Sequence, residues 1–188
     1  MKIRTVQLED SEALLKIYEE YILHTEITFE YDVPFVEAFK NRIQAIYRQY
    51  PFLVIEDQGV ILGYAYAHRM FERKAYDWDV ELSIYFRHDA TSCGYGTKLL
   101  MTLLDLLKLQ QVRNAYSLIT LPNEKSEGLQ KKLGFILCGV YHQAGYKHGK
   151  WLDVGVYEKH LLSHDDVPSI WIPFCELKED AINKIIQG

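Results

Sequence analysis

A strand-like run that leads into a pair of glycines and a leucine-rich segment is the feature of this sequence that most constrains the fold. The run reads "WDVELSIYF" (78–86), and the glycines follow in "CGYGTKLL" (93–100). Glycine is entropically costly to order, so Gly94 and Gly96 at a helix entrance indicate a special turn or a close approach to the main chain. Because a helix start also carries unpaired N–H groups and partial positive charge, the segment predicts a phosphate held at the turn. A tight turn without a ligand is the alternative that these residues leave open.

Two familiar phosphate-binding loops do not match this turn. No Gly-Lys-Ser/Thr sequence is present, which excludes the P-loop, and Leu99 stands where the dinucleotide-binding fingerprint has its third glycine. The net charge of the chain is −5, so an anionic ligand needs a local basic site, for which Arg87, His88 and Lys98 are candidates. The acidic balance also excludes a general nucleic-acid binder.

Cysteine and histidine usage predicts neither disulfides nor a metal site. Cys93, Cys138 and Cys175 are odd in number and widely spaced, and the seven histidines show no paired ligand spacing. Residues 1–7 lack an apolar signal core, and charges interrupt every apolar stretch before it reaches the length of a membrane span. We therefore expect a soluble, cytoplasmic protein with no membrane partner.

Hydrophobic periodicity predicts one domain in which strands and helices follow in a defined order. Strands are predicted at 2–7, 52–56, 60–71, 78–86, 115–121, 135–142 and 151–161. Helices are predicted from residue 10 or 11 to about 22, from 35 up to Pro51, after the glycine pair, and from about 123 to 133. Residues 24–34 read as a loop between the first two helices.

Alternation along the run at 78–86 places Glu81 in the middle of a strand. Val80 and Leu82 point to one face, whereas Glu81 and Ser83 point to the other. A solvated outer face is the common fate of such a carboxylate. Because this strand leads into the glycine turn, a group bound there has its reactive end beside Glu81, and a partly desolvated carboxylate can take a proton from an amine.

The order of these elements resembles the GCN5-related N-acetyltransferase (GNAT) fold, and the chain is similar to its phosphinothricin acetyltransferase family. Five segments carry this resemblance, from about residue 2 to residue 162: "YPFLVIEDQGVILGYAYA", "RKAYDWDVELSIYF", "GYGTKLL", "LPNEKSEGLQKKLGF" and "GYKHGKWLDVGVYEKHL". The resemblance implies an α/β (α+β) fold with a mixed central sheet of about seven strands flanked by helices. It implies a GNAT domain at 1–162, a C-terminal appendage at 163–188, and acetyl-CoA as co-substrate.

By the same resemblance, the anion at the glycine turn is the pyrophosphate of coenzyme A. The implied cofactor contacts are backbone amides of Ser92, Cys93, Gly94, Tyr95, Gly96 and Thr97, and the main chain of Ile84, Tyr85 and Phe86 along the pantetheine arm. A backbone N–H near Phe86 is expected to stabilise the oxyanion. Asn123 matches a family residue near the pantetheine arm, and a helix cap is its alternative role.

The resemblance also implies an acceptor site with Glu81 as the catalytic base. Arg73 and Tyr76 in "RKAY" match the family's acceptor-binding segment, where a guanidinium suits a carboxylate or a phosphinate. Thr28 and Phe29 in "EITFE" match the loop that walls the acceptor pocket. For the segment with Gly145 and Gly149 we favour a turn between the last two strands over chemical work by Lys147, His148 or Asp153, with Trp151 and Val154 packing.

Two positions depart from the family pattern. Thr91 stands where the glycine turn usually starts with Gln or Arg, which should weaken phosphate binding without abolishing it. Gln130 stands where the family has histidine or, in many relatives, tyrosine. A glutamine amide donates a hydrogen bond but cannot protonate the leaving thiolate. The rate, the acceptor or both are therefore expected to differ.

The function that follows is acetyl transfer by direct attack from acetyl-CoA to the amine of a small amino-acid-like acceptor of the phosphinothricin or methionine sulfoximine type. Acetylation of another amine, such as a protein N-terminus or a polyamine, stays open, as does a non-catalytic acetyl-CoA-binding regulatory domain. In the tail, Trp171 and Phe174 are two of several large apolar residues that need cover. A homodimer formed through the tail and a tail folded back on its own chain are equally consistent with this pattern.

Overall fold

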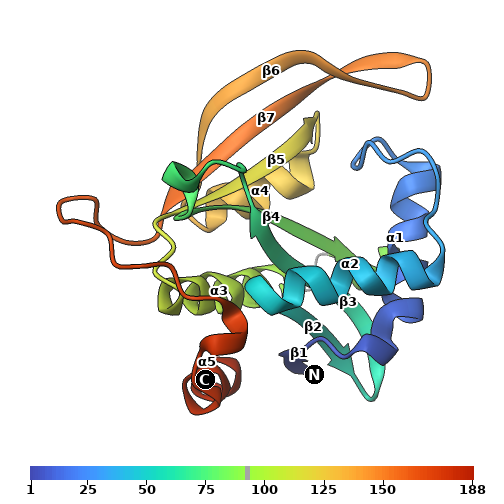
Figure 1. The fold of residues 1–188 in the computed structure, drawn as a ribbon. Coiled ribbons are helices and arrows are strands. Elements are labelled where there is room, and N and C mark those ends of the chain that lie inside the picture. Colours follow the sequence, from blue (N-terminus) through green and yellow to red (C-terminus); the bar gives the residue numbers. More distant parts are fainter. Residues whose placement is uncertain (92–93) are drawn as a thin grey trace.

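The computed structural model describes residues 1–91 and 94–188 and contains one mixed sheet of seven strands, in the order β1-β2-β3-β4-β5-β7-β6 (Figure 1). The strands are β1 Lys2–Thr5, β2 Phe52–Asp57, β3 Val60–Arg69, β4 Asp79–Phe86, β5 Asn114–Leu121, β6 Ile136–Lys147 and β7 Lys150–His160. Neighbouring strands are antiparallel except β4 and β5, which are parallel. The expected α/β fold with about seven strands is confirmed.

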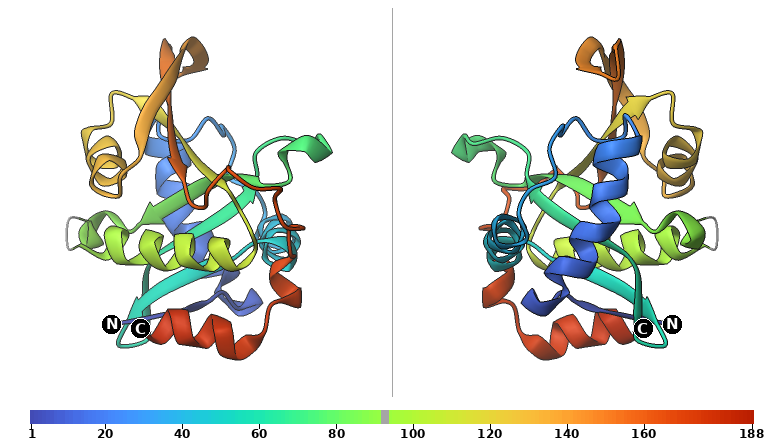
Figure 2. Two further views of the ribbon diagram at one scale, coloured as in Figure 1. Left: turned by 90° about the vertical axis from the view of Figure 1, so that its left-hand side faces the viewer. Right: turned by 90° about the vertical axis from the view of Figure 1, so that its right-hand side faces the viewer.

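The helices cover both faces of the sheet, and the strand alternation explains why. The helices are α1 Ser11–His24, α2 Val36–Gln49, α3 Tyr95–Leu109, α4 Glu124–Lys132 and α5 Glu179–Gln187. In β2, Leu53 and Ile55 join one buried cluster with α3, whereas Phe52 and Val54 join another with α1 and α2. Figure 2 shows α1 and α3 on opposite sides of the sheet. In the part of the chain that the structure describes, no helix has the length and apolar character needed to cross a bilayer.

The parallel pair β4–β5 opens after three residue pairs, and this opening positions the site. Pairing runs only from Asp79 and Asn114 to Glu81 and Tyr116, while β5 stays paired with β7 as far as Leu121. Hydrogen-bonded and non-bonded pairs alternate between antiparallel strands. Since the N–H of Arg87 donates to the carbonyl of Leu62 (2.9 Å), odd-numbered residues of β4 turn their backbone groups to β3. The backbone groups of Leu82 and Ile84 therefore face the opening.

The C-terminal tail packs on its own chain. Phe174 is 3% exposed, and the Trp171 ring lies 5.2 Å from that of Tyr50 between centroids. The backbone of Ile172 donates to the carbonyl of Gln110 (3.1 Å) and accepts from that residue's side-chain amide (2.7 Å). These contacts cover most of the apolar residues that the sequence left without a partner, although Ile170 stays exposed.

Candidate active site

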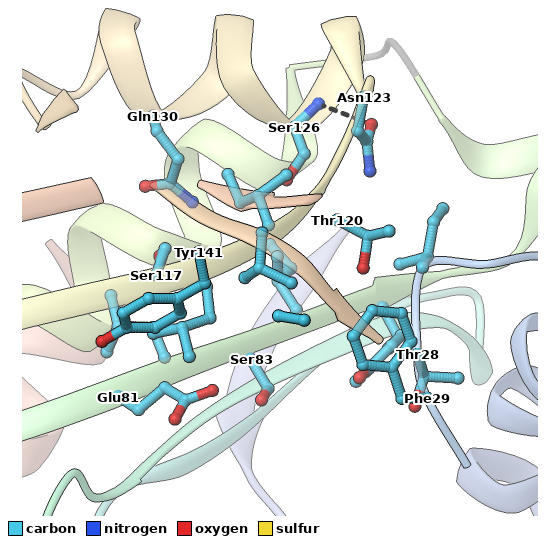
Figure 3. A pocket seen from close by; sticks show the side chains of 18 residues that line it. Thr28, Phe29, Glu81, Ser83, Ser117, Thr120, Asn123, Ser126, Gln130 and Tyr141 are labelled. Atoms are coloured by element: carbon cyan, nitrogen blue, oxygen red, sulfur yellow. Dashed lines mark hydrogen bonds between the residues drawn. The ribbon is translucent and has the colours of Figure 1, made fainter. Parts of the chain in front are cut away.

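A cavity of about 410 Å³ lies where β4 and β5 part (Figure 3). Its walls come from both strands, from the loop between α1 and α2, from α4, and from β6 and β7. The lining residues that carry side-chain polar groups are Thr28, Glu81, Ser83, Tyr85, Ser117, Thr120, Asn123, Ser126, Gln130 and Tyr141. Within this described lining Glu81 is the only charged residue, so any acid–base chemistry in the cavity centres on its carboxylate.

Glu81 lies at the last position of β4 that pairs with β5, beside the point where these two strands separate. Its side chain is 25% exposed, and desolvation by burial raises the pKa of the carboxyl above its usual range. His68 Nε2, 3.9 Å from Glu81 Oε1, opposes that rise in pKa. A carboxylate with a raised pKa is better able to accept a proton from an amine. Glu81 thus lines a cavity rather than a fully solvated face.

Two polar side chains on the α4 side of the opening have unpartnered atoms that line the cavity. Ser117 is 3% exposed and Gln130 is 2% exposed. Among the described residues, Ser117 Oγ and Gln130 Oε1 have no hydrogen-bond partner. Leaving a buried polar atom unpaired costs about 1–3 kcal/mol, so both atoms are available to a ligand. The sequence analysis did not place Ser117 in the site. The sequence signal that could have indicated it is a serine that alternates with Ala115 and Ile119, two core positions of the same strand.

The glycine turn forms a second cavity of about 450 Å³, which shares Ile27, Ile84, Asn123 and Ser126 with the first. Gly94 has φ of +80°, a left-handed conformation that favours glycine, and α3 begins at the next residue. Gly94, Tyr95, Gly96 and Thr97 all line this cavity, so the first-turn N–H groups of α3 lie where the sequence predicts an anion. Ser92 and Cys93 lie outside the described residues.

The basic residues beside the glycine turn differ from those expected. His88 lines the cavity as expected, but the Arg87 guanidinium bonds to Asp89 (3.0 and 2.7 Å). Lys98 lies outside the described lining, and Lys125 and Lys132 of α4 contribute instead. The signal for these two lysines was their spacing of seven residues, which places them on one face of a helix. Thr91 also lines the cavity, and its hydroxyl donates to the carbonyl of His88 (3.2 Å).

The backbone of Phe86, near which the sequence places the oxyanion site, is engaged by a tyrosine. The Tyr21 hydroxyl donates to the Phe86 carbonyl (2.6 Å) and accepts from its N–H (3.2 Å). Five residues of strand, about 16 Å, also separate Phe86 from Glu81. Because Tyr85 turns its backbone groups to β3, Leu82 and Ile84 are the residues whose N–H groups face the opening near Glu81.

The structure brings together two of the four expected acceptor residues. Thr28, buried and hydrogen-bonded through Oγ1 to the Tyr18 hydroxyl (2.8 Å), lines the cavity together with Phe29. Arg73 and Tyr76 lie in the exposed segment before β4, at the two ends of a short 3-10 helix (Lys74–Tyr76 with Arg73 as its N-cap), outside the described linings of both cavities.

Asn123 combines the two roles that the sequence left open. Its Oδ1 accepts from the N–H of Ser126 (3.2 Å), so it caps α4. The residue also lines both cavities at the place where they join.

Comparison with known proteins identifies the family of this chain. A family model described as an acetyltransferase (GNAT) domain matches residues 3–156. A phosphinothricin N-acetyltransferase of Streptomyces viridochromogenes is 33% identical over 159 residues, which cover 85% of this chain and 87% of that protein. An L-methionine sulfoximine/L-methionine sulfone acetyltransferase of Pseudomonas paraeruginosa is 32% identical over 162 residues, which cover 85% and 94%.

A solved structure agrees with these relatives. The GNAT superfamily phosphinothricin acetyltransferase of Sinorhizobium meliloti, in complex with AcCoA, superposes with a TM-score of 0.85 at 30% identity, covering 89% of this chain and 92% of that one. The split sheet and the glycine turn thus define an acetyltransferase. The chain belongs to the GNAT acetyltransferase family, and the N-acetyltransferase class expected from the sequence is confirmed.

Proposed function

We propose that this protein transfers the acetyl group of acetyl-CoA to the amine of a small amino-acid-like acceptor. The observation that carries the proposal is the position of Glu81. It is the charged residue of the described cavity lining, and it lies at the end of the opening where β4 and β5 are still paired. The glycine turn lies at the other end of the same connected space. The relatives, a phosphinothricin and a methionine sulfoximine acetyltransferase, support an acceptor of this type.

Each element of the site has a role in this proposal. The N–H groups of Tyr95, Gly96 and Thr97 hold the pyrophosphate, and His88, Lys125 and Lys132 supply positive charge. The backbone groups of Leu82 and Ile84, which face the opening, bond to the pantetheine arm and to the carbonyl oxygen under attack.

The chemistry is direct attack of the amine on the thioester carbonyl. The amine nitrogen forms the new C–N bond, Glu81 takes the proton that this nitrogen loses, and the C–S bond breaks with release of the thiolate. The Ser117 hydroxyl, whose Oγ has no partner among the described residues, and the Nε2 amide group of Gln130 can donate hydrogen bonds to that sulfur, since both residues line the side of the opening across from Glu81.

One observation favours a second class of acceptor, amines without a carboxylate, such as a polyamine. Such amines need no counter-cation, and the described cavity lining contains no lysine or arginine. In the first class, a carboxylate would have to be met by Arg73 from the loop before β4.

Acetylation of an acceptor panel tests the proposal. We expect release of free thiol from acetyl-CoA with L-phosphinothricin or L-methionine sulfone, and a raised acceptor KM in Arg73→Ala. Preference for spermidine, unaffected by Arg73→Ala, would favour the second class. Acetyl-CoA binding by calorimetry without turnover on any amine would leave only a binding domain.

We also propose that the protein is cytoplasmic and forms a homodimer. The acetyl-CoA pool and free thiols of the cytoplasm suit the co-substrate and the unpaired Cys138 and Cys175. Light scattering of the full chain measures the oligomeric state, and a mass equal to the 22.0 kDa chain would remove the dimer.

A further inference from the structure

Side chains at the tip of the β6–β7 hairpin contact the loop between α1 and α2, more than a hundred residues earlier in the chain. Figure 1 shows both segments at the right-hand side of the view. Lys147 Nζ donates to the carbonyl of Thr28 (2.7 Å), and the Tyr31 hydroxyl donates to the carbonyl of Tyr146. Glu26 Oε1 lies 3.0 Å from Lys150 Nζ and 3.6 Å from the ring of His148. We call this set of contacts between residues 26–31 and 145–150 the clasp.

Lys147 is the buried element of the clasp. It is 1% exposed, and desolvation lowers the pKa of its ammonium group, while Glu26 and Glu30 act in the opposite direction. Burying a charged amine is unfavourable unless its hydrogen bonds are satisfied. This ammonium donates to the carbonyl of Thr28, so the side chain fixes the backbone of the loop at a residue that lines the cavity.

Gly145 fixes the neighbouring residue of the same wall. A Cβ at this position would lie 2.1 and 2.2 Å from two ring carbons of Phe29, so the ring rests directly on the backbone of β6. Gly145 lies inside β6 and not in the turn, which is formed by His148 and Gly149 with φ of 48° and 80°. Trp151, beyond the turn, is 61% exposed. These two observations correct the expectation that Gly145 forms part of the turn and that Trp151 is packed.

The wall that the clasp holds faces the reactive carboxylate. Thr28 and Phe29 line the cavity together with Ala144 and Tyr141 of β6. In Figure 3, Thr28 and Phe29 lie at the end of the cavity away from Glu81. The distance between this wall and Glu81 limits the size of the group that can be bound beside the carboxylate.

We propose that Lys147 and Gly145 are positioning residues that set acceptor size: Lys147 holds the Thr28 carbonyl, and Gly145 makes room for the Phe29 ring. The inference rests on the proposed function, because it assigns the cavity to the acceptor. It does not involve the glycine turn, whose described lining contains no residue of the β6–β7 hairpin.

The first test replaces the buried lysine and uses the exposed lysine of the clasp as control. Lys147→Met keeps length but removes the donor, and we expect the KM for L-methionine sulfone to rise about tenfold, the scale of one hydrogen bond to a charged group. The acetyl-CoA Kd from calorimetry should not change. Lys150→Met should leave both constants as in the wild type, because an exposed ion pair such as Lys150–Glu26 contributes little. An unchanged acceptor KM, or an equal loss of acetyl-CoA affinity, would overturn the inference.

A second variant, Gly145→Ala, tests the role of this wall independently of Lys147→Met. Gly145→Ala should push the Phe29 ring into the cavity and shift kcat/KM toward L-alanine over L-methionine sulfone by about tenfold, since a small change of pocket volume discriminates on that scale. In a Phe29→Ala background the same substitution should have no effect. An equal shift in both backgrounds would refute the role of Gly145.

Hydrogen exchange separates failure of this inference from failure of the proposed function. A wild type inactive on every amine contradicts the function alone. Faster exchange of the amides of residues 26–31 in Lys147→Met would still support the clasp, and unchanged exchange would overturn it.

Discussion

Replacing Glu81 by glutamine tests the chemistry most directly, because the two side chains have nearly the same shape and only the carboxylate can accept a proton. In the described lining no second carboxylate is available to take over. We therefore expect kcat to fall by about 10²-fold, the usual scale of general-base help, or about 2.7 kcal/mol of transition-state stabilisation. His68, with Nε2 at 3.9 Å from the carboxylate, is a neighbour that can limit the loss, and Glu81→Gln/His68→Ala should lose more.

The pH dependence gives this prediction a sign. The base must be ionised, so wild-type activity should rise with pH through a pKa that burial has raised above that of an ordinary glutamate. Because His68 lowers this pKa, His68→Ala should move the rise to higher pH. The deficit of Glu81→Gln should shrink at high pH, where the free amine is abundant.

Stability provides an independent readout. A carboxyl whose pKa is raised in the folded state contributes stability below its unfolded pKa, and this contribution is lost as pH rises through the folded pKa. The neutral glutamine avoids that loss, so Glu81→Gln should melt at a higher temperature than the wild type at pH 7 while turning over more slowly. The acetyl-CoA Kd should not change, and exposed Glu12→Gln serves as the matched control. Normal turnover of Glu81→Gln at neutral pH would refute the assigned role.

Three further predictions concern other parts of the molecule. Gly94→Val, at φ of +80°, should abolish acetyl-CoA binding in calorimetry while the protein stays folded by circular dichroism; unchanged affinity would remove the cofactor assignment. Ser117→Ala should lower kcat about tenfold with little effect on acceptor KM, and an unchanged kcat would mean that this hydroxyl does not assist thiolate release. Phe174→Ala should lower the free energy of unfolding in urea by about 3 kcal/mol, whereas Ile170→Ala should have almost no effect; equal effects would contradict the packing of the tail.

The sequence predicted the elements well because their signals are local. Alternation in the run at 78–86 is confirmed, with Val80 and Leu82 in one buried cluster and Tyr85 packed against the other. The loop at 24–34 and the helix after the glycine pair are confirmed for the same reason. Period and capping depend on a few neighbouring residues, and a single sequence contains that information.

The parts that the sequence did not predict depend on distant contacts. The Tyr21 hydroxyl occupies the backbone of Phe86 from 65 residues away, and no local pattern indicates where the pairing of two strands stops. The position of Arg73 outside the cavity was not predicted for the same reason. The motif gives the residue, but the position of its loop depends on contacts such as the ion pair of Arg69 with Asp77 (2.9 Å).

The opening of the sheet explains why the site has so few charged groups. A strand that leaves its neighbour exposes backbone donors and acceptors, as an edge strand does, but here in the interior of the sheet. At the C-terminal end of β4, the Tyr21 hydroxyl bonds to the backbone N–H and carbonyl of Phe86, whereas the backbone groups of Leu82 and Ile84 face the cavity. Ser117 and Gln130 add unpaired atoms beside them. Since buried backbone groups are nearly always paired, a ligand that supplies an extended, amide-containing arm completes this sheet. The pantetheine arm of acetyl-CoA has that chemistry, so in the proposed function the arm binds through the backbone of the fold, and Glu81, the one carboxylate of the described cavity lining, acts on the amine.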